Sequence, residues 1–168
     1  MKDSTQVNIE IRKPRIDECS QVLTLMQDLA AFEGYLDAFN VTQASLEQHY
    51  YEVQAFNILV VAMDNQLQGI LVYYFLPFTY DLTPWLFMKE LYVKPEKRGL
   101  GLGKQLMKAA AKECQEKGGS RMNWQVLTDN HHAQDFYRQL GATHDPLWQN
   151  FSLSKPAIER LLKEQADD

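Results

Sequence analysis

The stretch from Lys89 to Lys104, KELYVKPEKRGLGLGK, decides how the rest of this sequence is interpreted. Its first five residues are typical of a strand, and Pro95 ends that strand in a charged turn. Three glycines then alternate with leucines, and a helix-favouring segment from Leu102 to Lys117 follows. Glycine lets the backbone approach a ligand closely, and a helix N-terminus carries a partial positive charge. The order strand, glycine-rich turn and helix therefore predicts a binding site for a phosphate-bearing ligand.

Two common phosphate-binding motifs do not fit this turn. The P-loop needs a glycine, four residues and then Gly-Lys-Ser/Thr, but Arg98 occupies the first position and Gln105 follows Lys104. The dinucleotide pattern GxGxxG fails because Lys104 stands at the third glycine. The pattern that fits is Arg-x-x-Gly-x-Gly, formed by Arg98, Gly101 and Gly103. A tight turn with no ligand is the alternative interpretation.

This pattern resembles the Q/R-x-x-G-x-G/A motif of the GNAT superfamily of N-acetyltransferases. A second segment, Asn130 to Gly141, reads N-x-x-A-x-x-F-Y-x-x-x-G and is similar to the late helix of that family. The resemblance implies that acetyl-CoA is the co-substrate and that no metal takes part. It also implies that a splayed central strand offers backbone groups to the pantetheine arm. The residues expected to contact acetyl-CoA are Leu91, Tyr92, Val93, Arg98, Gly99, Leu100, Gly101, Leu102, Gly103, Lys104, Asn130, Ala133 and Tyr137.

The remaining sequence predicts a mixed α/β fold. Strands are expected at 7–13, 56–63, 68–75, 85–93, 121–127 and 148–153, and helices at 17–32, 42–53, 102–117, 130–141 and from Pro156. No repeat or linker divides the chain, so a single domain over residues 1–168 is expected. The resemblance implies the GNAT fold: a mixed, mostly antiparallel sheet of about six to seven strands, flanked by helices and splayed at the central strand.

Composition limits the class of protein. The net charge of −5 argues against nucleic acid or an anionic membrane as the main partner. The longest apolar run, Ile70 to Phe78, is too short to span a bilayer, and the N-terminus does not resemble a signal peptide. The two cysteines lack metal-ligand spacing and suggest a reducing compartment. We therefore expect a cytoplasmic protein.

Transfer of an acetyl group to a primary amine sets specific chemical demands. The amine has a pKa of about 10.4, so it must lose a proton before it attacks the thioester. Glu90, or Glu33 acting through water, is our hypothesis for the group that accepts this proton. By resemblance, Tyr137 is expected to donate a proton to the departing sulfur, although a purely structural tyrosine is the alternative.

Within the superfamily, the sequence is most similar to the diamine (spermidine/spermine) and thialysine N-acetyltransferases. Leu29 to Glu33 resembles the end of that group's first helix, so Phe32 and Glu33 are expected at the acceptor site. Asp81 and Trp85 are expected there as well, because a cation is bound well by carboxylates beside aromatic faces. The diamine enzymes carry two consecutive acidic residues on the central strand, whereas this chain has Lys89-Glu90.

The position of Lys89 decides between two kinds of amine. Neighbouring side chains of a strand point to opposite faces unless a bulge intervenes. If Lys89 faces the acceptor, it repels a dication and favours a substrate that bears a carboxylate, such as an amino acid with a side-chain amine. If it faces away, a diamine or polyamine remains suitable.

Two other classes of function stay open. One is a protein or peptide N-acetyltransferase, and the other is a non-catalytic acyl-CoA-binding module, which the presence of Tyr137 disfavours. The aromatic residues Trp148 and Phe151 suggest a homodimer, as in similar enzymes.

Overall fold

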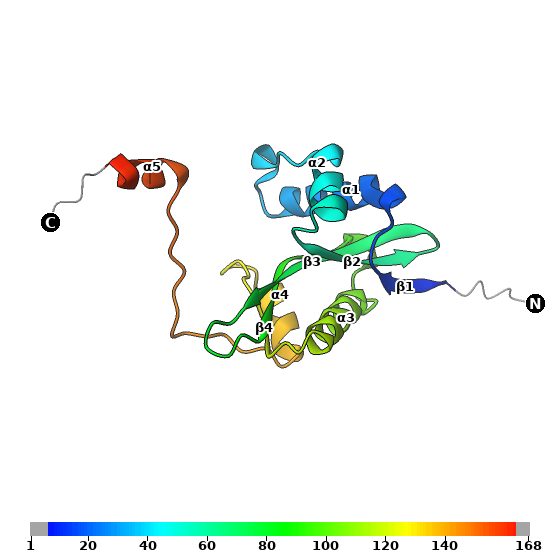
Figure 1. Cartoon of the computed structure of the whole chain (residues 1–168). Coiled ribbons are helices and arrows are strands. Elements are labelled where there is room, and N and C mark those ends of the chain that lie inside the picture. Colours follow the sequence, from blue (N-terminus) through cyan, green and yellow to red (C-terminus); the bar gives the residue numbers. More distant parts are fainter. Residues whose placement is uncertain (1–6, 164–168) are drawn as a thin grey trace, which may run out of the picture. The chain divides into compact units, whose positions relative to one another are not determined.

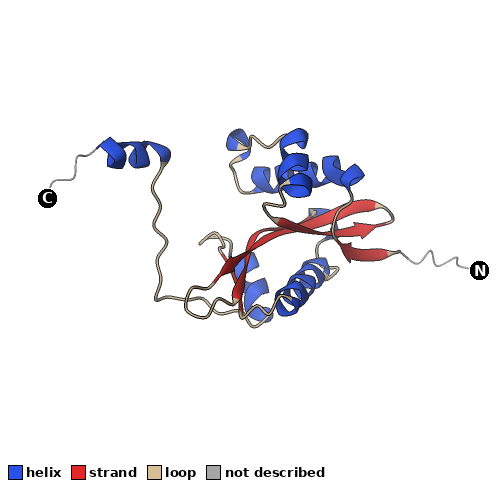
Figure 2. Cartoon of the chain, viewed as in Figure 1, coloured by secondary structure: helices blue, strands red, loops and turns tan. Residues whose placement is uncertain are grey.

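The computed structural model describes residues 7–163 of the chain. The chain divides between Leu127 and Thr128 into two compact units, each of which is described by itself. The first unit holds one five-stranded sheet with helices on both faces (Figures 1 and 2). The expectation of a single domain stays a prediction.

The sheet has the strand order β1-β2-β3-β4-β5, which is also the order along the chain. The first three neighbouring pairs are antiparallel and β4 pairs with β5 in parallel, so the sheet is mixed as predicted. The strands are β1 (Ile9–Arg12), β2 (Asn57–Met63), β3 (Gln66–Pro77), β4 (Pro84–Val93) and β5 (Arg121–Trp124). These are five strands within residues 7–163, where six to seven were expected.

Helices cover the two faces of this sheet. On one face lie α1 (Cys19–Phe32) and the short α2 (Gln43–Glu47), and on the other lies α3 (Leu102–Glu116) (Figure 1). Short helical turns connect these elements: η1 (Ile16–Glu18), η2 (Leu36–Ala38), the π-helical η3 (Gln48–Glu52) and η4 (Pro95–Lys97).

The central strands are apolar on both faces, and this explains their uninterrupted hydrophobic runs. Ile58, Val60, Ile70 and Val72 belong to the core cluster under α1 and α2. The alternate residues of the same strands are also buried, on the face that α3 covers; they are Leu59, Val61, Leu71 and Tyr73. Side chains of a strand alternate between faces, so a strand buried on both sides has almost no polar positions.

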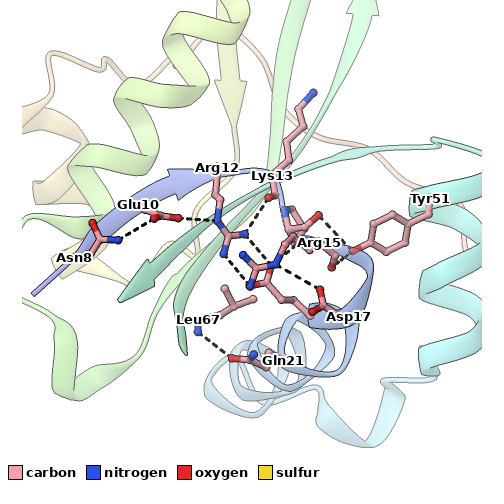
Figure 3. A network of polar contacts seen from close by, with 11 residues as sticks. Asn8, Glu10, Arg12, Lys13, Arg15, Asp17, Gln21, Tyr51 and Leu67 are labelled. Carbon is pink, nitrogen blue, oxygen red and sulfur yellow. Dashed lines mark hydrogen bonds and ion pairs between the residues drawn. The ribbon is translucent and has the colours of Figure 1, made fainter. Parts of the chain in front are cut away.

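The entry into α1 is fixed by a buried ion pair at the end of β1. Both carboxylate oxygens of Glu18 accept from Arg12, at 2.8 Å each, and the side chain of Glu18 is only 3% exposed. Arg15 adds its backbone N–H at 2.8 Å and its guanidinium at 2.9 Å. Arg12, Arg15 and Tyr51 converge on this junction (Figure 3), which ties the first strand to the first helix.

The second unit contains α4 (His131–Gln139) and α5 (Lys155–Lys163). Asn130 caps α4, because its side-chain oxygen accepts from the N–H of Ala133 at 3.1 Å. The expected strand at 148–153 is wrong: this segment has no regular structure, and Trp148 and Phe151 are 80% and 91% exposed. An isolated apolar segment forms no ladder without a neighbouring strand to pair with. No helix among residues 7–163 is long and apolar enough to cross a membrane.

Candidate active site

The glycine-rich turn predicted from the sequence lies exposed at the N-terminus of α3. Gly99 and Gly101 have φ angles of 79° and 75°, in the left-handed region that favours glycine. A Cβ atom added to either would meet nothing within 4 Å. The glycines are therefore required by the backbone conformation, and the space in front of the turn is open in the first unit.

The start of α3 presents backbone donors at this turn. The first intrahelical hydrogen bond runs from Gln105 N to Gly101 O at 3.1 Å. The N–H groups of Leu102, Gly103 and Lys104 thus precede the helical ladder. Donors at a helix N-terminus and the helix dipole together suit an anion. The residues present fit a diphosphate group.

The strand that leads to this turn has one free edge. The pairing of β4 with β5 ends at Met88 and Trp124, whereas its pairing with β3 continues to Val93. The splay of the central strand is therefore confirmed, and it begins after Met88, two residues before Glu90. Lys94 N donates to Gln68 O at 2.9 Å, so Leu91 and Val93, in the alternate positions, direct their backbone groups away from β3. These backbone groups face the gap left by β5.

A β-bulge in β4 settles how Lys89 and Glu90 lie. Val72 pairs with Glu90 and the next residue, Tyr73, pairs with Met88, so Lys89 is the extra residue. The bulge turns Glu90 to the face of the sheet that carries α1. It also brings the two side chains together, with 3.7 Å between Lys89 Nζ and Glu90 Oε1. The Lys89 side chain is 65% exposed and that of Glu90 only 16%.

The environment of Glu90 raises the proton affinity of its carboxylate. Burial raises its pKa above the ordinary glutamate value, and the negative charge of Glu33 raises it further, while Lys89 acts in the opposite direction. A raised carboxyl pKa from burial and a like charge is typical of groups that exchange protons during catalysis. The structure therefore pairs Lys89 with Glu90, and the charge of Glu33 acts on the same carboxyl group.

The end of α1 places Glu33 by a recognisable backbone motif. Gly34, with φ 79°, follows the helix; its N–H donates to Ala31 O at 3.2 Å, and Tyr35 N donates to Ala30 O at 3.0 Å. These are the two bonds of a Schellman motif, which needs a left-handed residue after the helix. The motif holds Glu33 and Tyr35 on either side of the glycine.

Tyr35 adjoins Glu33 and Glu90 and is absent from the residues expected at the acceptor site. Its pKa is raised by burial and by the carboxylates of Glu90 and Glu33, so its hydroxyl lies near both. The signal in the sequence is the glycine before it, because a Schellman glycine turns the next residue back toward its helix.

Arg98 is directed at the end of α1 rather than into the glycine turn. Its Nε donates to the carbonyl oxygen of Val93 at 3.1 Å. Its guanidinium carbon lies 5.3 Å from the ring centre of Phe32 and 5.8 Å from that of Tyr92. Phe32 is thus brought to the site, at the boundary between the glycine turn and the acidic cluster.

Asp81 and Trp85 lie at the other end of β4, in and beside the β3–β4 hairpin loop. Asp81 accepts from the backbone and hydroxyl of Thr83, at 2.9 and 2.7 Å, and these bonds lower its pKa. Trp85 stacks on Phe78, with 4.2 Å between the ring centres. Five residue steps along the strand, about 15 Å, separate Trp85 from Glu90. The structure does not bring this pair next to the carboxylates, and their contact with a substrate stays a prediction.

The remaining predicted contacts, Asn130, Ala133 and Tyr137, belong to the second unit. Asn130 and Ala133 form the N-cap of α4, and Tyr137 lies two turns along the same helix with its ring 5.3 Å from that of Phe136. Their contacts with acetyl-CoA stay predictions. Among residues 7–163 there is no cluster of three or more His, Cys, Asp or Glu side chains that could hold a metal ion.

The comparison with known proteins identifies the family. Residues 24–142 match the model of the Acetyltransferase (GNAT) family, and the chain belongs to this family of N-acetyltransferases. It is 28% identical over 166 residues to thialysine N-epsilon-acetyltransferase of Bos taurus, covering 91% of this chain and 96% of that protein. It is 27% identical over 154 residues to the human spermidine/spermine N(1)-acetyltransferase-like protein 1, covering 84% of this chain and 21% of that protein.

A solved structure supports the fold independently. The aminoglycoside N-acetyltransferase AAC(6')-Iy, solved in complex with CoA, superposes with a TM-score of 0.73 at 16% identity, covering 90% of this chain and 98% of that one. The predicted α/β GNAT fold is thus confirmed, with five strands in the described part of the chain in place of the expected six to seven.

Proposed function

We propose that this protein transfers the acetyl group of acetyl-CoA to the side-chain amine of an amino acid, by direct attack in a ternary complex. One observation carries the proposal: a helix N-terminus with free N–H groups follows, after a short turn, a strand whose free edge adjoins Lys89 and Glu90, with the charge of Glu33 nearby. The relatives named for acetylation of thialysine support the same class of substrate.

The first unit contains the groups that acetyl-CoA binding requires. The N–H groups at the start of α3 would hold the diphosphate, and the backbone of Leu91 and Val93 would hold the pantetheine arm. Acetyl-CoA supplies the acetyl group as an activated thioester. The solved relative in complex with CoA supports this assignment.

The acidic cluster would bind the amine and accept its proton. An ammonium group between Glu33 and Glu90 lowers the repulsion between the two carboxylates. A free amine forms when a carboxylate takes the proton, directly or through water, and the raised pKa of Glu90 brings its proton affinity closer to that of the amine. In the second unit, Tyr137 would donate a proton to the sulfur that leaves.

Lys89 favours an amino acid over a polyamine. Its exposed ammonium lies 3.7 Å from Glu90, on the same side as the acidic cluster. A substrate carboxylate placed at Lys89 leaves a side-chain amine to reach Glu90. A second ammonium of a polyamine at that position would be repelled.

The test is release of free thiol from acetyl-CoA over a panel of amines. Lysine analogues and ornithine are expected to react faster than spermidine and than peptides. Tyr137→Phe is expected to lower turnover about 100-fold with acetyl-CoA binding retained, and the same change at the exposed Tyr80 serves as control. Preferred acetylation of peptides would favour the protein-acetyltransferase alternative, and CoA binding without any turnover would favour a binding module.

The substrate class is tested by Lys89→Glu, with Lys89→Gln as the control that only removes the charge. The glutamate is expected to shift the ratio of kcat/KM from amino acids toward polyamines by about tenfold or more, and the glutamine by less. Equal ratios in all three proteins would contradict the assignment of Lys89 to the substrate carboxylate.

We also propose that the protein acts in the cytoplasm as a homodimer. Both cysteines, Cys19 and Cys114, are free and buried, as is usual in a reducing compartment. The exposed apolar side chains of the second unit support self-association; they include Leu147, Trp148, Phe151 and Leu162.

A further inference from the structure

We infer that Arg98 is a positioning residue for the amine site, because its guanidinium fastens the end of α1 to β4. The inference rests on the proposed function for its kinetic consequence, but the contact itself is independent of any substrate. A pyrophosphate ligand is the only role that the sequence motif suggested for this side chain.

We use the word clamp for Arg98 together with the three groups that it contacts. These groups are the carbonyl of Val93 and the rings of Phe32 and Tyr92. The hydrogen bond from Nε to Val93 O is 3.1 Å long and fixes the direction of the side chain. It uses one of the five N–H donors of the guanidinium, so a phosphate can still be met by others. Both ring centres lie within the roughly 6 Å over which a cation is attracted to an aromatic face.

The two rings of the clamp belong to very different surroundings. Tyr92 is 7% exposed and is part of the hydrophobic core, so it gives the clamp a rigid base. Phe32, the last residue of α1, is 58% exposed and has little of its surface held by the core. Arg98 therefore supplies an attachment for a helix end that packing alone holds weakly.

The residues that follow Phe32 make this attachment important for the amine. Glu33 is next in the chain, and Tyr35 follows the glycine of the Schellman motif. A displacement of Phe32 is transmitted to both through these few backbone bonds. Arg98 is also the residue directly before Gly99, the first glycine of the turn. The clamp therefore lies between the proposed cofactor site and the proposed acceptor site.

Lysine is a suitable substitution for separating the two roles. It keeps a positive charge for a phosphate, but it lacks the planar guanidinium that stacks on two rings and donates from Nε. Phe32→Leu removes the other half of the contact and keeps the residue apolar. Lys104→Gln removes a charge from the same glycine turn without touching the clamp and is the matched control.

The experiment is hydrogen exchange of the protein without ligand, read at the amides of Glu33, Gly34 and Tyr35, which are all hydrogen-bonded at the end of α1. Arg98→Lys and Phe32→Leu are each expected to speed this exchange about 3- to 30-fold. The double variant is expected to add little to either single change. Lys104→Gln is expected to leave these amides unchanged while weakening CoA binding.

The kinetic consequence is a higher KM for the amine in both Arg98→Lys and Phe32→Leu, with a smaller change in kcat. The affinity for CoA is expected to stay within about twofold of wild type in Phe32→Leu. The inference would be overturned if both single variants exchanged these three amides at the wild-type rate. It would also be overturned if the effects of the two changes were fully additive in the double variant. If the wild-type protein acetylates no amine, the proposed function fails, while the exchange measurement still decides on the clamp.

Discussion

Glu90 acquires its position from one additional residue in its strand. Without the bulge at Lys89, Glu90 would lie on the same face as Met88, under α3. With the bulge it faces α1 and lies within electrostatic range of Glu33, while Lys89 stays exposed beside it. The local change in register thus decides where the charged groups of Lys89 and Glu90 lie.

The pH dependence of the reaction tests this arrangement. If Glu90 accepts the proton as a carboxylate, kcat/KM is expected to fall as the pH drops through its pKa, which lies above the ordinary glutamate value. Glu90→Gln is expected to remove this acidic limb and to lower the rate by about 100-fold or more. A pH–rate profile over the acidic and neutral range measures both.

Glu33→Gln is the matched variant for this measurement. It removes a like charge that raises the pKa of Glu90, so the acidic limb is expected to move to lower pH. Profiles that are unchanged in both variants would rule out both residues as the base.

Tyr73 shows a different kind of residue-scale constraint. Its side chain is fully buried, and its hydroxyl has no hydrogen-bond partner within residues 7–163. Burial and the nearby carboxylate of Glu113 raise its pKa. A buried hydroxyl without a partner costs about 1–3 kcal/mol of desolvation.

Tyr73→Phe is therefore expected to raise the free energy of unfolding by about 1 kcal/mol. Urea denaturation followed by circular dichroism measures the change, with Tyr80→Phe on the exposed hairpin loop as a neutral control. A loss of stability in Tyr73→Phe would show that the hydroxyl is bonded in solution.

At the scale of elements, the connection between β1 and α1 depends on the buried carboxylate of Glu18. Its pKa is lowered chiefly by hydrogen bonds from Arg12, because these bonds favour the charged form. Such a group stabilises the fold above its unfolded-state pKa, and the contribution is lost as the pH falls through its folded-state pKa. The network holds the first turn of α1 on the sheet (Figure 3).

Glu18→Gln is expected to destabilise the protein by about 3 kcal/mol at neutral pH, since it removes the buried carboxylate that pairs with the partly buried guanidinium of Arg12. The deficit is expected to shrink as the pH is lowered below the ordinary glutamate pKa, where wild type loses the same contribution. Asp17→Asn, at an exposed carboxylate 3.5 Å from Arg15, is expected to cost at most about 0.5 kcal/mol. An equal deficit at every pH would contradict the electrostatic account.

At the scale of the whole molecule, the two units differ in how their apolar side chains are covered. The first unit buries a continuous core on both faces of its sheet. In the second unit, α5 and the segment before it expose large apolar side chains. Surfaces of this kind are common at protein–protein interfaces.

A homodimer is accordingly expected in solution, with twice the 19.5 kDa mass of the chain. Light scattering on a size-exclusion column measures the mass. The paired change Trp148→Ser and Phe151→Ser is expected to shift the equilibrium toward the monomer, because it removes two of the most exposed aromatic side chains. A monomeric wild-type protein at micromolar concentration would refute this prediction.

The sequence by itself determined the family, the order of the elements from β1 to α4 and the glycine turn before α3. The glycines of the turn carry this information locally, because a left-handed backbone at the start of a helix leaves few other residues possible. The apolar runs and helix caps likewise reflect interactions within a few residues of each other.

Only the tertiary structure decided on which side Lys89 lies, that Arg98 reaches Phe32, and that 148–153 forms no strand. The bulge depends on the register between β3 and β4, and the clamp joins residues 66 positions apart in the chain. A strand likewise exists only where a neighbour accepts its hydrogen bonds. Each of these outcomes is set by packing between distant segments, and a local pattern of residues does not contain that information.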